Sequence, residues 1–128
     1  MTRAHLVRAT LESLAFQIRD VADAMAADAG SPLQALRVDG GASANDFLMQ
    51  FQADLLGLPV ERPALVETTA VGAAQLAGLA VGFWRTPKEL AAMRRKDRRF
   101  RPRMPAERRE ALYHGWQEAV RRVRSRFA

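Results

Sequence analysis

A pair of glycines followed by small polar residues is the part of this sequence best suited to chemistry. Gly40 and Gly41 close a short apolar run, and Ser43 and Asn45 follow within four residues. Glycines let a backbone approach a ligand where a side chain would collide, and the first amides of a following helix have no acceptor inside it. Those amides and the helix dipole favour an anion, most simply a phosphate. The same pattern is also typical of a plain tight turn, so both interpretations stay open.

The commoner phosphate-binding loops are absent from the chain. Neither G-x-x-x-x-G-K-[ST] nor G-x-G-x-x-G occurs anywhere in it. A nucleotide site at Gly40 and Gly41 would therefore be of another kind.

Two other groups of residues are candidates for binding. His5 and His114 lack the paired acidic or histidine spacing typical of a metal site, and the chain has no cysteine, so no metal ligand is predicted. The segment from Arg94 to Arg103 (residues 94–103) holds seven basic residues in ten. Such a run could bind the phosphates of a nucleic acid, or it could be a solvated surface. Phe100 is its one aromatic residue, which favours the surface and makes a nucleic-acid partner a secondary alternative.

The net charge of +6 is distributed unevenly along the chain. Residues 1–85 carry 6 basic and 9 acidic side chains, a net of −3, whereas residues 86–128 carry 14 and 5, a net of +9. The basicity is therefore a local property of the carboxyl-terminal third.

Length and composition predict a single globular domain spanning residues 1–128. Hydrophobic residues make up 48% of the chain and charged residues 27%, which is typical of a soluble protein with a real core. The longest uncharged stretch, from Thr68 to Trp84, is broken by glycines and Gln75 and falls short of the roughly 20 apolar residues that cross a bilayer. With no cysteine as well, we expect a cytoplasmic protein that makes no membrane contact.

The elements that flank the glycine pair follow from hydrophobic spacing. A helix is predicted from Thr2 to Asp28, stopping at Gly30, with one buried face. That face comprises Val7, Leu11, Leu14, Ala15, Ile18, Val21, Ala22 and Met25. A short strand from Ala35 to Asp39 then leads into the glycines.

A second helix is predicted directly after the glycines. Ser43, with Asp46 three residues later, resembles a capping box for it. Its buried side would comprise Phe47, Leu48, Phe51 and Leu55, and Gly57 would end it.

The rest of the chain is predicted to alternate in the same way. Val60 to Arg62 should be a strand at a sheet edge, because the flanking prolines remove ladder donors. Three helices should follow, ending near Trp84, ending at Met93, and beginning after Pro105. We expect the last helix to have an apolar face comprising Leu112, Trp116, Ala119, Val120, Val123 and Phe127.

Several stretches of the chain carry a resemblance in the same register. They are residues 37–42, Asn45, residues 47–54, 60–63, 67–74 and 78–84. Together they look like the carboxyl-terminal domain of the FGGY family of carbohydrate kinases. The amino acids within these motifs favour the glycerol kinases of that family, and its other sugar kinases remain the alternative.

The resemblance implies a fold class and a reaction. The fold would be α/β, part of a ribonuclease-H-like domain of the actin, Hsp70 and hexokinase type, rich in helices and with short strands. The implied reaction transfers the γ-phosphate of ATP to glycerol and gives ADP and glycerol 3-phosphate, with Mg²⁺ in the complete enzyme.

The resemblance also implies which residues bind the nucleotide. The Gly40-Gly41 turn would support the adenosine and the α-phosphate, Gly41 through its backbone and Asn45 through its side-chain amide. The family often has a second Asn where this chain has Asp46, which leaves the role of that position open.

The resemblance places the catalytic base, the glycerol-binding residues and the γ-phosphate loop upstream of the part that matches Thr2 to Ala29. No catalytic residue is therefore assigned within the chain, and we expect it to be inactive alone, with no tightly bound nucleotide. Because two short strands make a poor independent sheet, helix surface should be left exposed. The expected partners are an adenine nucleotide and either the missing kinase segments or another copy of the chain in a homo-oligomer.

Overall fold

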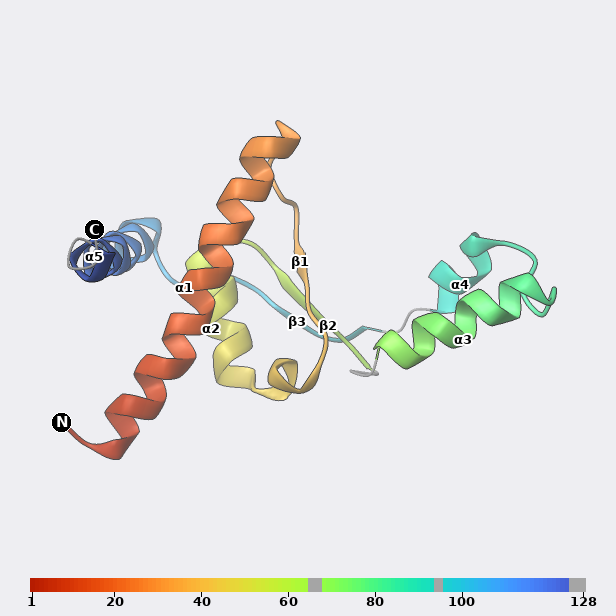
Figure 1. Cartoon of the computed structure of the whole chain (residues 1–128), viewed down its shortest axis with the longest axis horizontal. Coiled ribbons are helices and arrows are strands. Elements are labelled where there is room, and N and C mark those ends of the chain that lie inside the picture. The colour runs from red at the N-terminus through yellow and green to blue at the C-terminus, as the bar shows by residue number, and fades with distance from the viewer. Residues whose placement is uncertain (65–67, 94–95, 125–128) are drawn as a thin grey trace.

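A small sheet with helices around it forms the centre of the molecule (Figure 1). The computed structural model describes residues 1–64, 68–93 and 96–124. The elements in chain order are α1 (Arg3–Ala29), β1 (Leu36–Arg37), the 3₁₀ helix η1 (Gly41–Ala44), α2 (Asp46–Leu56), β2 (Val60–Pro63), α3 (Thr68–Ala80), α4 (Pro87–Met93), β3 (Lys96–Phe100) and α5 (Ala106–Arg124).

The sheet has the strand order β1-β2-β3. β1 runs parallel to β2, with Leu36 opposite Val60, and β2 runs antiparallel to β3, with Val60 opposite Phe100. Two predictions are corrected here. The basic segment contributes a third strand, and β2 lies in the middle of the sheet, not at its edge.

The prolines are compatible with this central position because they lie at the ends of β2. Pro59 lacks an N–H, but its carbonyl oxygen accepts from the Leu36 amide at 2.9 Å. Pro63 lies where the register between β2 and β3 shifts. Each missing donor therefore falls where the ladder is already ending or irregular.

The core lies between α2 and the sheet, with α1 on the other side of α2. Its buried residues are Ala15, Leu48, Met49, Phe51, Ala53, Leu55, Val60 and Phe100. Three of the four predicted α2 residues are among them. Phe47 is the exception: it is 43% exposed and stacks on Phe51 with the ring centroids 6.2 Å apart.

The helix predicted from Thr2 to Asp28 is confirmed, but its predicted buried face is wrong. Only Ala15 and Ala22 of that face are buried, and the side that packs on the body also carries Phe16 and Arg19. Small alanines let α1 lie close to its neighbours, so the larger apolar side chains point elsewhere. The exposed ones are Val7, Leu14, Ile18, Val21 and Met25.

The third predicted helix is shorter than expected. α3 ends at Ala80, because the chain turns at Gly82 (φ +75°) and the Phe83 amide donates to the Gly78 carbonyl at 2.8 Å. α3 and α4 extend away from the sheet, on the side opposite α5 (Figure 1). No helix in the part of the chain that the structure describes is long and apolar enough to span a membrane.

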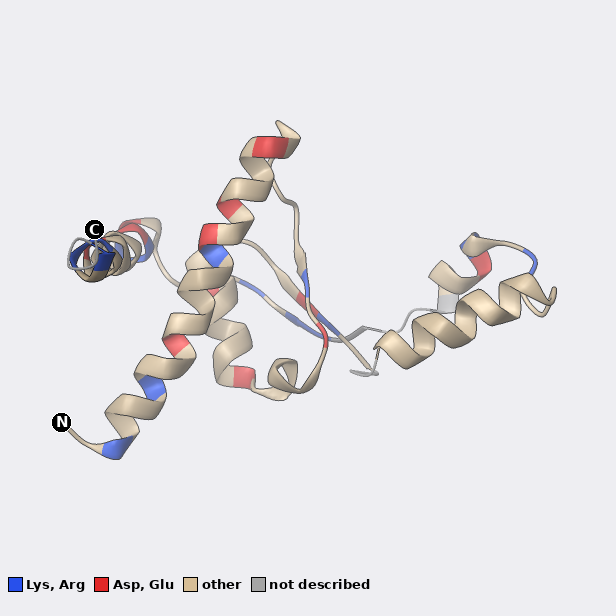
Figure 2. Ribbon diagram, viewed as in Figure 1, with Lys and Arg blue, Asp and Glu red and all other residues tan. Residues whose placement is uncertain are grey.

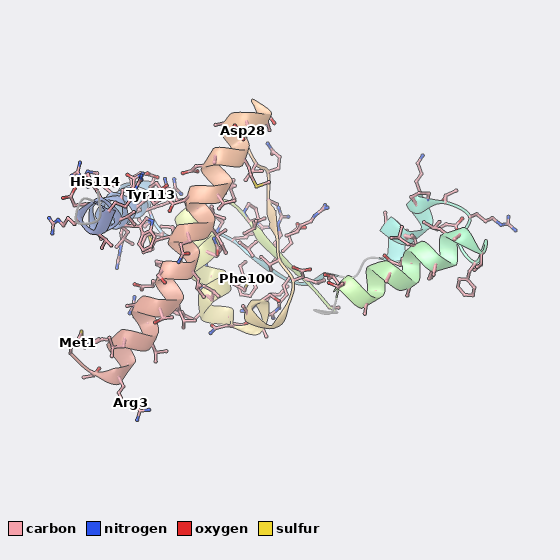
Figure 3. The ribbon with its side chains drawn as sticks, viewed as in Figure 1. Met1, Arg3, Asp28, Phe100, Tyr113 and His114 are labelled. Atoms are coloured by element: carbon pink, nitrogen blue, oxygen red, sulfur yellow. The ribbon has the colours of Figure 1, made fainter. Side chains whose placement is uncertain are left out.

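α5 is attached to α1 by a polar and aromatic cluster. The Asp20 carboxylate accepts from Tyr113 Oη at 2.6 Å and from Trp116 Nε1 at 2.9 Å. Trp116 stacks on Phe16, with centroids 5.4 Å apart, and Tyr113 lies on the part of α5 beside α1 (Figure 3). Burial and the hydrogen bond to Asp20 raise the pKa of Tyr113 to about 12. These contacts fix the carboxyl-terminal helix although none of its residues in the described range is fully buried.

We expect Asp20→Ala to lower the free energy of unfolding by about 1–2 kcal/mol, because it removes the acceptor of both donors on α5. Asp20→Asn keeps an acceptor oxygen and should cost less, while lowering the pKa of Tyr113 because the negative charge is lost. Urea unfolding and the absorbance of tyrosinate during an alkaline titration measure the two effects. Equal stability of wild type and Asp20→Ala would contradict the role of this cluster.

Candidate functional site

The Gly40-Gly41 turn joins β1 to η1 and needs a glycine at its first position. Gly40 has φ +78° and ψ 173°, a backbone conformation that is strongly unfavourable for residues other than glycine. Its carbonyl oxygen accepts from the Ser43 amide at 3.1 Å and from Ser43 Oγ at 2.7 Å. Ser43 is buried at 1% exposure, so hydrogen bonds to a buried residue hold the turn in place.

Gly41 differs from Gly40 because its backbone does not require glycine. It does not have a positive φ, and a Cβ built on it would meet no atom of the described residues within 4 Å. As far as the described residues show, a Cβ at this position would therefore meet no steric clash.

The predicted cap of the second helix is wrong by two residues. Ser43 lies inside η1, and the N-cap of α2 is Asn45, whose Oδ1 accepts from the Leu48 amide at 3.1 Å. The local pattern misled because the 3₁₀ turn delays the start of the α-helix.

The capping bond leaves the other end of the Asn45 side chain available. Within the described part of the chain, its Nδ2 group donates to no protein acceptor. The two N–H bonds can therefore be offered to a ligand that lies against the turn.

All three residues predicted to bind nucleotide belong to this one turn. Gly40 shapes it, Gly41 leaves open space beside its backbone, and Asn45 closes it at the start of α2. Thr68 Oγ1 at the start of α3 donates to Asp39, the residue before Gly40, so the beginning of α3 lies beside the same turn.

Asp46 does not place an unbalanced negative charge at the site. Its Oδ1 lies 2.8 Å from Arg62 Nη1 on β2, and its Oδ2 pairs with Arg98 on β3. The hydrogen bond from Arg62, supported by the charge of Arg98, lowers the pKa of Asp46. Sequence reasoning missed Arg62, because nothing local to it indicates a contact with a turn almost twenty residues earlier.

Acidic side chains on other elements balance part of the charge of the basic segment. Arg98 pairs with Asp46, and Arg99 lies 3.6 Å from Glu61, which also faces Arg37 at 3.8 Å. Figure 2 shows basic residues along β3. Arg94 and Arg95 lie outside the described residues. The arrangement favours a sheet strand over a surface built for nucleic acid.

The two histidines lie on different helices, His5 on α1 and His114 on α5. His5 Nδ1 accepts from the Thr2 amide at 3.2 Å and so helps to cap α1, and His114 lies on α5 (Figure 3). Among residues 1–64, 68–93 and 96–124, no three side chains of His, Cys, Asp or Glu form a group that could hold a metal ion.

Comparison with known proteins places the chain in a family. Residues 1–81 match the model of the carboxyl-terminal domain of the FGGY family of carbohydrate kinases. The chain is 63% identical over 121 residues to the glycerol kinase of Caldanaerobacter subterraneus subsp. tengcongensis. It is 65% identical over 120 residues to that of Carboxydothermus hydrogenoformans. Each match covers 94% of this chain but 24% of the relative, so the chain spans about a quarter of the length of these curated relatives.

Solved structures of kinases share the fold. Plasmodium falciparum glycerol kinase with ADP has a TM-score of 0.84 at 38% identity. The match covers 95% of this chain and 25% of the Plasmodium chain. The xylulose kinase of Rhodospirillum rubrum has a TM-score of 0.78 at 29% identity and covers 99%, which matches 26% of it. These likenesses confirm the expected class, a partial ribonuclease-H-like α/β domain rich in helices.

We expect Asn45→Ala to lower the free energy of unfolding by about 1 kcal/mol, because the Leu48 amide loses its acceptor. Asn45→Asp keeps the acceptor, removes the Nδ2 donors and adds a negative charge that a helix start favours, so its stability should be at least near that of wild type. Urea unfolding followed by circular dichroism compares the three proteins. A variant Asn45→Ala as stable as wild type would mean that the cap contributes nothing.

Proposed function

Because the chain belongs to the FGGY family of carbohydrate kinases, as a carboxyl-terminal domain, we propose that it forms part of the nucleotide side of a kinase active site. The complete enzyme would transfer the γ-phosphate of ATP to glycerol and release ADP and glycerol 3-phosphate. Glycerol is supported as the acceptor by the identity of 63% and 65% to glycerol kinases, against 29% to a xylulose kinase. Another sugar acceptor of the same family is the alternative.

The observation that carries the proposal is the open, preformed turn at Gly41 and Asn45. Among the residues that the structure describes, no atom fills the space beside the Gly41 backbone, and none accepts from the Asn45 Nδ2 group. A similar solved kinase is a complex with ADP. We assign the contact with an adenine nucleotide to the backbone of Gly41 and the side chain of Asn45, with Gly40 shaping the turn.

The remaining chemistry belongs to other segments of the kinase. Phosphoryl transfer depends on positioning, on neutralising charge around the migrating group and on a residue that orients or deprotonates the acceptor. The family resemblance assigns the base, the acceptor site and the γ-phosphate loop to segments that these 128 residues do not match. Mg²⁺ would accompany the phosphates of ATP and neutralise their charge in the complete enzyme. This chain's part is to bind and orient the nucleoside end.

Two uncovered surfaces support the proposal that other segments complete the domain. α1 exposes an apolar stripe that includes Leu14 and Ile18, and within the described residues β1 pairs with β2 alone. We propose that the other kinase segments cover both surfaces, and that a second copy of the chain does so where those segments are missing. A chain without cysteine suits a reducing compartment, so we propose a cytoplasmic location.

Replacing Gly41 with Val tests the nucleotide site directly. The variant should fold normally, because the space beside Gly41 is open, and should bind ADP at least about tenfold more weakly, since a branched side chain would meet the nucleotide. Titration with a fluorescent ADP analogue measures the affinity, and thermal unfolding checks the fold. Arg99→Ala is the control, because Arg99 faces Glu61 and not the turn. Unchanged ADP affinity in Gly41→Val would contradict the assignment.

The same proteins test the nucleic-acid alternative. Tight, saturable binding of an oligonucleotide at about 0.15 M salt, lost in Arg99→Ala and falling steeply with salt, would support that alternative against the kinase proposal. We expect weak binding without saturation.

The 128-residue chain should show no ATP-dependent phosphorylation of glycerol on its own. We expect this because the family resemblance assigns the catalytic base to other segments of the kinase. A coupled assay for glycerol 3-phosphate, with a complete glycerol kinase as the positive control, measures this. Turnover above background by the purified chain would show that the catalytic assignment is wrong.

A further inference from the structure

Arg62 on β2 lies where its guanidinium can hold the nucleotide turn. Its Nη1 atom donates to the carbonyl oxygens of Ser43 at 3.0 Å and Ala44 at 3.4 Å, and to Asp46 Oδ1 at 2.8 Å. The side chain is 12% exposed. A single guanidinium nitrogen therefore reaches the end of η1 and the beginning of α2 at once.

The three acceptors need a donor of this kind. Ser43 and Ala44 are the last residues of η1, and the last carbonyls of a helix have no partner within it. These carbonyls carry partial negative charge, which a guanidinium complements. Asp46 is the first residue of α2, where a carboxylate is favoured by the helix dipole. Arg62 thus joins two helical elements whose dipoles meet at Asn45.

Arg62 is itself held firmly by the sheet. Its guanidinium carbon lies 5.4 Å from the ring centroid of Phe100, which is 3% exposed, and that of Arg98 lies 4.8 Å from the same ring. Both arginines pair with Asp46. Because β2 is paired on both sides, the sheet fixes the position of Arg62. Arg62 in turn links the sheet to the Gly40-Gly41 turn.

We propose that Arg62 is a positioning residue of the nucleotide site, which fixes the Gly41 backbone and the Asn45 side chain in their binding arrangement before the nucleotide arrives. The inference rests on the proposed function for the role of the turn. It assigns the guanidinium to protein oxygens at the turn, so Arg62 acts through Ser43, Ala44 and Asp46. Lysine is a poor replacement, because its flexible stem lacks the planar guanidinium that lies against the Phe100 ring and fixes the direction of the donor.

The test is Arg62→Lys in the whole chain, with Arg99→Lys as the matched control. Arg99 lies on the same sheet and pairs with Glu61 instead of the turn. Amide hydrogen exchange followed by NMR reports on the Asn45 amide, bonded to the Ala42 carbonyl, and on the Leu48 amide, bonded to Asn45 Oδ1. We expect Arg62→Lys to speed exchange at both amides about tenfold and to weaken ADP binding about tenfold. Arg99→Lys should change neither.

The outcomes separate this inference from the proposed function. If Gly41→Val loses ADP binding while Arg62→Lys keeps wild-type exchange and affinity, the positioning role is overturned and the proposed function stands. If wild type binds no ADP, the proposed function fails, and the exchange rates still decide whether Arg62 orders the turn. Equal acceleration at a core amide such as that of Leu55 would show that Arg62 acts on overall stability, which also overturns the inference.

A second variant keeps the test decisive if Arg62→Lys does not fold. Asp46→Ala removes both the charge and the acceptor oxygens that draw Arg62 to the start of α2, and leaves the carbonyl oxygens of Ser43 and Ala44 in place. We expect a smaller acceleration at the Asn45 and Leu48 amides in the same direction. Wild-type exchange in Asp46→Ala would overturn the proposed link between Arg62 and the turn.

Discussion

The pairing of β2 with strands on both sides is the constraint on which the rest of the structure depends. Successive side chains of a strand point to opposite faces, so one short segment serves three purposes. Val60 is fully buried in the core against α2, Glu61 faces Arg37 and Arg99 on the opposite side, and Arg62 returns to the side of α2 and reaches the turn. A shift of one residue in its register would exchange these environments, placing Glu61 towards the core and the turn.

Local patterns in the sequence predicted the elements better than their contacts. Helix spacing and the glycines predict the presence of α1, α2 and the turn correctly, because these depend on neighbours within a few residues, although the cap of α2 lies two residues later than predicted. The strand β3 was missed, since a run of arginines indicates solvent until its partners are known. Those partners are distant: Arg98 and Asp46 are 52 positions apart. The charge pairs of this sheet therefore become visible only when its register is known.

The packed side of α1 shows a second limit of sequence reasoning. Hydrophobic periodicity identifies an apolar face, but this helix has two sides able to pack. The side with alanines and Phe16 lies against the body, and the side with larger residues such as Val21 and Met25 does not. For the site, the position of Gly40, Gly41 and Asn45 in one turn agrees with the sequence, whereas their contact with a nucleotide stays a prediction. The role of Asn45 as a helix cap was not foreseen, because the 3₁₀ turn before it has no clear sequence pattern.

The capping bond of Asn45 has a consequence for ligand selectivity. An amide side chain can usually be rotated to exchange its oxygen and nitrogen, but here the Leu48 amide requires the oxygen. The nitrogen end is therefore the one left for a ligand, and it presents hydrogen-bond donors alone. A ring nitrogen, a hydroxyl oxygen or a phosphate oxygen can accept there, whereas an exocyclic amino group would meet a second donor and be disfavoured. The helix start thus sets the polarity of the atom that can be bound next to it.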